Sequence, residues 1–212
     1  MLRSWMWCVC VFGCFAGCSC ADEGDIVLPE PVKTGGMPLM DALANRASCR
    51  NFSAREPDTQ TLSDLLWAAW GINRPDGRRT APSALNKQEI TLYVILKSGV
   101  YIYDAEKHVL KLVTSGDHRD LAGTQDFTHS APVTLVYAAD FSRQVSPSDE
   151  YAAAGAGFIG QNVYLFAAAN GMATVFRASI DRDGIRKCFE LTPSQRPLFA
   201  QSVGYEGTSF LE

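Results

Sequence analysis

The residues best suited to chemistry in this sequence form one short run, Arg46-Ala47-Ser48-Cys49-Arg50-Asn51-Phe52. If the run is extended, Arg46, Ser48 and Arg50 point to the same side, because side chains alternate along a strand. Two guanidinium groups around a hydroxyl supply the charge-assisted hydrogen bonds that a phosphate accepts. A solvated basic edge would show the same pattern. An isolated charge pattern is weak evidence for a binding site, so this alternative stays open. The run is therefore a candidate phosphate site, and Phe52 is expected to anchor it to a core.

A second polar stretch, Pro82-Ser83-Ala84-Leu85-Asn86-Lys87-Gln88, starts thirty residues after Phe52 and carries the other half of the functional hypothesis. It closes a polar loop from 73 to 80. That loop contains three arginines, Arg74, Arg78 and Arg79. The residues that follow the stretch, 90–96, are rich in β-branched and aromatic side chains, which is typical of a strand.

Size and composition limit the kinds of protein that this chain can be. With 212 residues it is long enough for one full-sized domain and short for two. Apolar residues make up 47% and charged residues 20%, which indicates a globular protein rather than a disordered one. The formal net charge of -4 argues against a general nucleic-acid binder, which usually has a large basic excess.

The first 21 residues are typical of a signal peptide. A short basic start precedes 5–17, which are uncharged and apolar or small, and too few to span a bilayer comfortably. Ser19-Cys20-Ala21 resembles a small-x-small cleavage site. Residues 15–18 resemble a bacterial lipobox with Cys18 as the lipidated residue, although Phe15 stands where an aliphatic residue is usual. We expect an exported protein, periplasmic or a membrane-anchored lipoprotein, with an uncleaved anchor as the alternative.

The cysteines are distributed unevenly along the chain. Five of the seven lie in the leader, and only Cys49 and Cys188 remain beyond it. No disulfide framework of the small secreted kind is therefore expected. One bridge between Cys49 and Cys188 and two buried free thiols both fit the sequence, and free thiols are the more common behaviour of such residues.

The rest of the sequence predicts a flexible tether over 22–36, rich in Pro and Gly, and a folded domain over 37–212. Hydrophobic spacing predicts the helices, and β-branched or alternating runs predict the strands. The predicted helices cover 37–45, 58–70, 117–121, 149–170 and 185–189, and the predicted strands cover 90–96, 100–104, 109–113, 133–139, 173–180 and 199–205. This order contains no regular βαβ repetition, so the predicted fold class is α+β.

One motif in the longest predicted helix is misleading. Gly155-Ala156-Gly157-Phe158-Ile159-Gly160 matches the GxGxxG pattern of dinucleotide-binding folds. That fingerprint needs a strand running directly into the first glycine, whereas 149–154 is polar and then helix-favouring. We expect instead that the glycines remove bulk, so that a partner helix or a flat ring approaches closely. The histidines show no HExxH spacing, and neither a GxSxG elbow nor a phosphate-loop motif occurs.

In their order and spacing, four motifs together resemble the FMN-dependent nitroreductase family, over 38–206. They are Arg46-x-Ser48-x-Arg50-x-Phe52, Pro82-Ser83-Ala84-Leu85-Asn86-x-Gln88, Gly160-Gln161-Asn162-Val163-Tyr164-Leu165 with Gly171, and Val203-Gly204-Tyr205. The runs 66–73 and 79–84 are most similar to the branch that contains azoline-oxidising (thiazole- and oxazole-forming) dehydrogenases. The resemblance implies a three-layer fold, with a central, mostly antiparallel sheet flanked by helices, in a homodimer.

The resemblance further implies that FMN binds where the two subunits meet. It assigns Arg46, Ser48 and Arg50 to the phosphate and ribityl end of the cofactor. It assigns Asn86 to the pyrimidine edge of the isoalloxazine, with Ser83 and Gln88 in the same motif.

A third segment completes the expected cofactor site. The resemblance places Phe176-Arg177-Ala178-Ser179 where backbone groups lie near the flavin N5. The basic pair that many family members carry near the C-terminus is absent, since nothing basic follows Arg196. Four arginines are candidates to replace it: Arg74, Arg78, Arg79 and Arg177. We expect Arg177 to do so.

The implied function is an FMN-dependent oxidoreductase that transfers hydride through flavin N5 in a ping-pong cycle. A small-molecule donor and a small-molecule acceptor would bind in turn, and no side chain has to act as a nucleophile. No metal is expected. Export leaves the electron donor open, because NAD(P)H is not expected outside the inner membrane. The alternative is an exported flavin-binding or envelope lipoprotein module of the same fold without catalysis.

Overall fold

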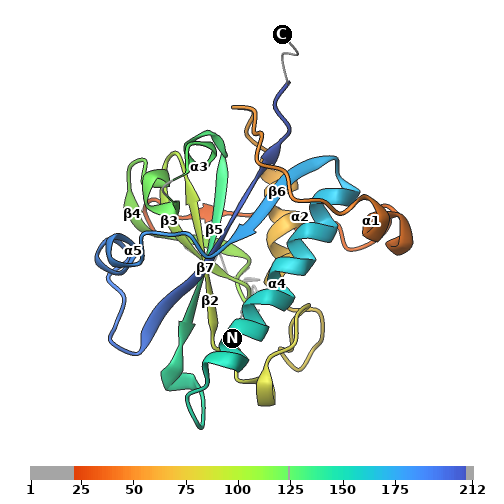
Figure 1. The fold of residues 1–212 in the computed structure, drawn as a ribbon. Helices are drawn as coiled ribbons and strands as arrows, with labels where there is room; N and C mark the ends of the chain where they lie inside the picture. Colours follow the sequence, from red (N-terminus) through yellow and green to blue (C-terminus); the bar gives the residue numbers. More distant parts are fainter. Residues whose placement is uncertain (1–21, 124, 209–212) are drawn as a thin grey trace, which may run out of the picture.

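A single seven-stranded sheet forms the centre of the protein (Figure 1). The computed structural model describes residues 22–123 and 125–208. All neighbouring strands in it are antiparallel, in the order β1-β4-β3-β2-β5-β7-β6. The strands are β1 (Ile26–Val27), β2 (Ile90–Leu96), β3 (Gly99–Asp104), β4 (Val109–Ser115), β5 (Val133–Asp140), β6 (Met172–Arg177) and β7 (Gln195–Tyr205).

Helices cover both faces of this sheet. The α-helices are α1 (Leu39–Asn45), α2 (Thr59–Trp70), α3 (Phe127–Ser130), α4 (Asp149–Ala169) and α5 (Arg182–Cys188), and the short 3-10 segments are η1 (Ala84–Asn86), η2 (Arg119–Ala122) and η3 (Phe141–Arg143). Helices α2 and α4 pack on one face around a core that contains the fully buried Leu65 and Ile159. Helix α5 packs on the other face through Ile185. This three-layer arrangement confirms the predicted α+β fold. No helix in the described ranges combines the length and apolar character needed to cross a membrane.

Helix α2 begins and ends where the sequence predicts. The Asp58 carboxylate accepts a hydrogen bond from the Thr61 amide at 2.7 Å, and the Gly71 amide donates to the Trp67 carbonyl at 2.8 Å. Trp70 is buried and donates from Nε1 to a backbone carbonyl of β2 at 3.0 Å. The helix is thereby fixed between the sheet, α4 and the N-terminal residues.

The glycines of α4 allow close packing against the sheet. A Cβ atom on Gly160 would lie 2.7 Å from the ring of Phe176, and one on Gly155 would contact the Ile90 side chain at 3.6 Å. Gly157 faces open space, with nothing within 4 Å of the position of its Cβ. The flat ring expected to approach the GxGxxG segment is therefore, at Gly160, a side chain of the same chain.

The last strand is longer than its prediction. Strand β7 begins at Gln195, four residues before the predicted start, and its pairing with β5 shifts register between Tyr137 and Ala138. Pro197 lies opposite Ala138 at this shift. Proline donates no backbone hydrogen bond and is tolerated in sheets mainly at edges and bulges, so the sequence signal for a strand is weak here.

Part of the segment predicted to be a flexible tether belongs to the fold instead. Residues Ile26–Val27 pair with β4, and the Asp25 carboxylate accepts from the Leu112 amide at 2.9 Å. Leu28 is buried, and the Val32 amide donates to Asp64 of α2 at 2.8 Å. The prediction for 22–36 is therefore wrong for these residues, because a two-residue strand and a few side-chain contacts give no periodic signal. We call residues 28–33 the N-terminal strap.

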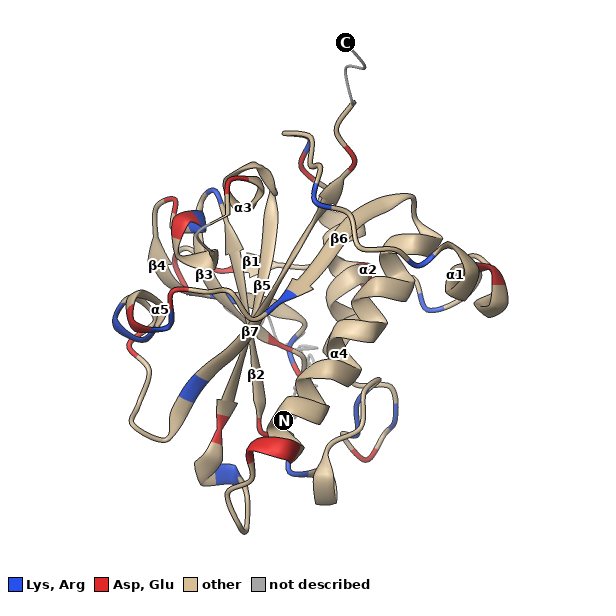
Figure 2. Cartoon of the chain, in the orientation of Figure 1, with Lys and Arg blue, Asp and Glu red and all other residues tan. Residues whose placement is uncertain are grey.

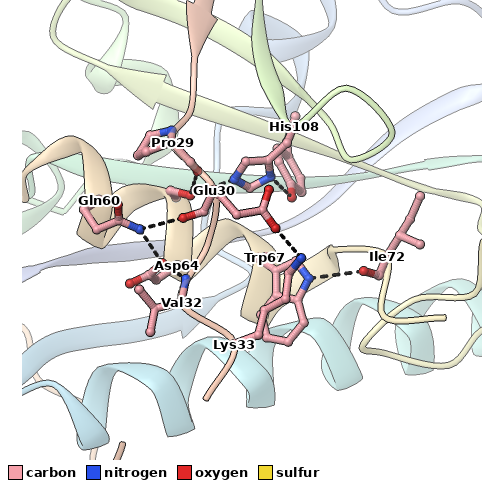
Figure 3. A network of polar contacts seen from close by, with 11 residues as sticks. Pro29, Glu30, Val32, Lys33, Gln60, Asp64, Trp67, Ile72 and His108 are labelled. Atoms are coloured by element: carbon pink, nitrogen blue, oxygen red, sulfur yellow. Dashed lines mark hydrogen bonds and ion pairs between the residues drawn. The ribbon is translucent and has the colours of Figure 1, made fainter. Parts of the chain in front are cut away.

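One histidine fastens the N-terminal strap to α2 (Figure 3). His108 Nδ1 lies 2.9 Å from the Tyr103 hydroxyl, and Nε2 lies 2.7 Å from Ser63 Oγ. Because Ser63 Oγ donates to the Pro29 carbonyl at 2.6 Å, it accepts from Nε2–H, and Nδ1 accepts from Tyr103. A neutral imidazole satisfies this chain of three hydrogen bonds, with Nε2 as a donor and Nδ1 as an acceptor.

Acid is therefore expected to loosen the N-terminal strap. Burial lowers the pKa of His108 below its ordinary value of 6.5, against smaller upward effects of Glu30 and Asp64, while Lys33 also lowers it. A lowered pKa stabilises the folded state fully above about pH 6.5, and this contribution is lost as the pH falls through the folded-state pKa. Hydrogen exchange at the Leu28 and Val32 amides, corrected for intrinsic rates, should accelerate several-fold between about pH 7.5 and pH 5.

The control for this prediction is another histidine. His129 is half-exposed and pairs with Asp120 at 2.7 Å, away from the strap. His129→Gln should keep the acid-dependent acceleration, and His108→Gln should lose its pH dependence. Equal protection of the strap at both pH values in the unmodified protein would contradict the assignment of His108.

Candidate cofactor site

The run Arg46–Phe52 lies along the edge strand β6. The Cys49 amide donates to the Thr174 carbonyl at 2.9 Å, and Phe52 forms an isolated bridge with Glu206. Phe52 is 8% exposed and packs against Ala131 and Val175, which confirms that it anchors the run. Cys49 and Cys188 are both free thiols. The edge of the sheet thus fixes the backbone that carries the candidate phosphate ligands.

Arg46 and Ser48 converge on Tyr164 of α4. Ser48 Oγ lies 2.8 Å from the Tyr164 hydroxyl, and the Arg46 guanidinium carbon lies 5.2 Å from the centre of the tyrosine ring. The Tyr164 hydroxyl also accepts from the Phe176 amide at 2.9 Å. When Tyr164 donates to Ser48, the hydroxyl hydrogen of Ser48 stays available for an anion. Tyr164 was not predicted as a site residue, although it lies in the family-like run 160–165.

The guanidinium groups of this run have no acidic partner. In the described chain, no ion pair joins Arg46 or Arg50 to a carboxylate. Arg50 is exposed and Arg46 is half-buried. The Arg46 guanidinium beside the Ser48 hydroxyl fits a phosphate better than any neutral group, and Arg50 follows two residues later in the same run.

The second stretch adopts a strained conformation. Leu85, Asn86 and Gln88 all have positive φ, of 51°, 54° and 48°, which L-residues rarely adopt. Ser83 Oγ accepts from the Gln88 amide at 2.9 Å, and Gln88 Nε2 donates to Asn86 Oδ1 at 3.1 Å and to the Gly77 carbonyl at 3.0 Å. Ser83 and Gln88 therefore support the turn, and Asn86 is exposed at its tip. Strain of this kind concentrates at functional sites.

Arg79 also supports this turn. Its Nε donates to Gln88 Oε1 at 2.7 Å, its Nη1 donates to the Trp70 carbonyl at 2.8 Å, and its guanidinium stacks on the Trp70 ring at 4.8 Å. Burial lowers the pKa of Arg79. These contacts join the loop from 73 to 80 to α2 and hold the strained turn in place.

The structure does not place Arg177 with the candidate phosphate ligands. Its guanidinium is buried and donates to the Ala122 carbonyl, to the Ser179 carbonyl at 3.1 Å and to Ser202 Oγ at 3.0 Å. Burial lowers the pKa of Arg177 to about 10. The prediction that Arg177 closes the phosphate site is wrong, because strand alternation puts it on the face away from Tyr164. Ala178 and Ser179 are exposed just beyond the end of β6.

One chain does not bring the two predicted halves together. Leu85 shares a hollow with Tyr151 at the start of α4, whereas Ser48 contacts Tyr164 thirteen residues further along the helix. At 1.5 Å per residue the two points lie about 20 Å apart along the axis. A single chain therefore holds the two halves at separate points along α4.

The outer surface of α1 and α4 is suited to meet a second copy of the chain. From Tyr151 to Asn170 the sequence contains no charged residue, and Figure 2 shows α4 free of charge after its first turn. Large apolar side chains are exposed here: Leu39, Met40 and Leu43 on α1, and Tyr151 and Phe158 on α4. Contiguous exposed apolar surface is typical of a protein interface.

The sequence and the fold are both similar to those of known proteins. The sequence matches the Nitroreductase family over residues 43–205. A protein of Methanocaldococcus jannaschii designated a nitroreductase is 28% identical over 197 residues, which cover 86% of this chain and 97% of that protein. The crystal structure of a protein with the same designation from Ralstonia eutropha JMP134 has a TM-score of 0.83 and 39% identity, covering 87% of this chain and 90% of that one.

A third relative shares the fold at lower sequence identity. It is the microcin synthetase McbBCD complex of E. coli, solved with truncated pro-MccB17 bound, with a TM-score of 0.66 and 20% identity. The match covers 86% of this chain and 78% of that one. The family match covers well over half of the sequence and agrees with the antiparallel three-layer architecture. The chain belongs to the Nitroreductase family.

Proposed function

We propose that this chain is an FMN-dependent oxidoreductase that works as a homodimer. Family membership supports an oxidoreductase, and members of the family typically bind flavin. The observation that carries the proposal is the convergence of Arg46 and Ser48 on Tyr164 beside β6, where no carboxylate of residues 22–123 or 125–208 pairs with the guanidinium. That donor set fits the phosphate of FMN.

The residues of the chain divide the work of holding the cofactor. Arg46, Ser48 and Arg50 would bind the phosphate and ribityl end, and Tyr164 would orient Ser48. The backbone of Ala178 and Ser179 would lie near the reactive end. When bound, FMN supplies reversible hydride and electron transfer at N5, so the protein has only to position the reactants and shape the electrostatics.

The second copy would complete the site. Asn86 stands at the tip of a turn that Arg79, Ser83 and Gln88 hold rigid. Packing of two α4 faces against each other would carry this turn toward Arg46 and Arg50 of the other copy. The pyrimidine edge of the flavin would then receive its hydrogen bonds from one chain and its phosphate contacts from the other.

The direction of the physiological reaction is a separate proposal. The motifs most similar to azoline-oxidising dehydrogenases favour oxidation of an organic substrate as one half of a ping-pong cycle. The shared fold of the McbBCD complex is consistent with that branch. Reduction of a nitro or quinone acceptor would be the other half under assay conditions.

Purification of the mature protein tests the function. We expect a yellow protein that releases FMN on denaturation and turns over artificial donors with nitroaromatic or quinone acceptors. Flavin without turnover would leave a flavin carrier. A colourless protein that takes up no added FMN would contradict the proposal and leave an envelope module of the same fold.

We also propose that the protein is exported. The support is the leader of residues 1–21, with Cys18 as the lipidated residue, and it lies outside the described residues. Incorporation of labelled palmitate that disappears in Cys18→Ala would support lipid attachment, and incorporation that persists in that variant would contradict it.

A further inference from the structure

Three arginines that the proposed cofactor contacts do not use line a hollow beside Ser83 and Asn86. The hollow measures about 460 Å³ and is bounded by the loop from 73 to 80 and the strained turn after it. Its walls are formed by Arg74, Arg78, Arg79, Ala81, Pro82, Ser83, Leu85 and Asn86. No acidic side chain is among these lining residues, so the hollow attracts anions.

Each arginine is positioned by part of its guanidinium, and within the described part of the chain its other donors have no partner. Arg79 spends Nε and Nη1 on Gln88 and Trp70, which leaves Nη2. Arg74 donates from Nε to Asn73 Oδ1 at 3.1 Å and from Nη2 to the Arg79 carbonyl at 3.2 Å, which leaves Nη1. Because a guanidinium has five N–H donors in a fixed fork, the remaining groups suit a planar oxyanion.

The loop from 73 to 80 carries little counter-charge of its own, although Asp104 and Glu106 also act on Arg79. Asp76 is the only acid in the loop from 73 to 80, and it pairs with Arg78 at 2.9 Å. Both side chains of this pair are about half exposed, at 54% and 51%, and such surface pairs contribute little. The loop therefore stays positive in a chain whose formal net charge is -4.

An apolar hollow adjoins the arginines across Leu85. Leu85 is 82% exposed and lines both hollows. The second hollow measures about 370 Å³ and includes Val145 and Tyr151, which are 77% and 58% exposed. A ligand with an apolar body and an anionic end would contact both hollows at once.

We infer that the redox substrate of this protein is an amphipathic carboxylate, with its carboxylate in the arginine hollow and its apolar or aromatic body against Leu85. The inference rests on the proposed function in one respect, that Asn86 beside the hollow contacts the flavin. Arg74 and Arg78 are the specificity-determining residues. Arg79 contributes charge but also braces the turn, so it is not used in the test.

The test compares ligands that differ only in charge. Binding of 2-naphthoate and of 2-naphthamide to the purified full-length protein is followed by ligand fluorescence, which needs neither bound flavin nor turnover. We expect the unmodified protein to prefer the anion by about tenfold, and the preference to shrink as salt screens the charges. The double variant Arg74→Gln/Arg78→Gln should lower this preference by about tenfold. Arg182→Gln/Arg186→Gln, which removes the same charge from α5, should keep it.

Turnover provides a second readout with matched acceptors. The acceptors 4-nitrobenzoate and 4-nitrobenzamide each take two electrons and two protons from the reduced enzyme and donor, giving the nitroso product and water. The ratio of their kcat/KM values should fall about tenfold in Arg74→Gln/Arg78→Gln. The inference would be overturned if the unmodified protein showed no preference for the carboxylate acceptor. So would a double variant with an unchanged ratio, or one that loses its flavin, since the arginines would then serve the cofactor.

Failure of the two ideas is distinguishable. A colourless, inactive protein that still prefers naphthoate would sink the proposed function and leave the anion site. A yellow, active protein that shows no preference for naphthoate would support the proposed function and overturn the anion site.

Discussion

The double substitution Arg46→Ala/Arg50→Ala is expected to give a folded protein that has lost its FMN. A hydrogen bond to a charged group contributes roughly 1.5–3 kcal/mol, so two arginines on one phosphate contribute about 3–6 kcal/mol. That range corresponds to a loss of about 10²- to 10⁴-fold in affinity. Flavin absorbance per polypeptide after gel filtration, and fluorescence titration with added FMN, measure the effect.

The fold itself should survive this change. Arg50 is exposed, and the stacking of Arg46 on Tyr164 at 5.2 Å is a contact worth about 0.5–1 kcal/mol. Arg182→Ala/Arg186→Ala on α5 removes the same charge from the opposite layer and is the matched control. The control should keep its flavin. Unchanged flavin stoichiometry in Arg46→Ala/Arg50→Ala, at native helix content, would refute the phosphate assignment.

The parts of the fold that the sequence predicts are those with a strong periodic signal. Strand 90–96 matches its predicted bounds, and α2 starts at an Asp cap and stops at a Gly, because both signals are local. Strand β1 was missed, since two residues held by the Asp25 carboxylate and the N-terminal strap have no period to detect. Local sequence signals thus predict the long helices and strands. Contacts between residues far apart in the sequence decide which short segments, such as β1, become part of the sheet.

The candidate site shows the same division. Residue type and spacing make Arg46 and Ser48 candidates, and the family resemblance adds Asn86, but the sequence does not predict the surroundings of these residues. The contact between the Tyr164 hydroxyl and Ser48 depends on how α4 is rotated about its axis, which the sequence does not predict. Arg177 was misassigned because its role depends on which face of β6 it occupies, and that parity is fixed by pairing with Ala200.

The sequence gives no sign that the glutamate just before β2 is buried. Glu89 is fully buried, and neither of its carboxylate oxygens has a hydrogen-bond partner in the described chain. A Cβ atom on Gly155 of α4 would lie 3.7 Å from its Oε1. Burial of a carboxyl group without a hydrogen-bond partner costs free energy. An acidic residue next to Gln88 is therefore expected at the surface.

The proposed homodimer gives the second prediction with a large expected effect, Phe158→Glu. Phe158 is 48% exposed on the uncharged outer surface of α4, beside the open Gly157 and in line with the exposed Tyr151. A carboxylate buried there without a partner costs several kcal/mol, and the symmetric interface would bury two of them. We therefore expect Phe158→Glu to be monomeric at micromolar concentration by sedimentation or light scattering.

The same variant should also lose its flavin, although Phe158 is not proposed to contact the cofactor. If each site takes its phosphate ligands from one copy and Asn86 from the other, separation of the copies removes half of every site. Val27→Glu is the matched control, because Val27 is 62% exposed on β1 at the opposite edge of the sheet. It should remain dimeric and yellow. A Phe158→Glu protein that is monomeric yet retains FMN would show that one chain binds the cofactor alone, and a dimeric one would show that the copies meet elsewhere.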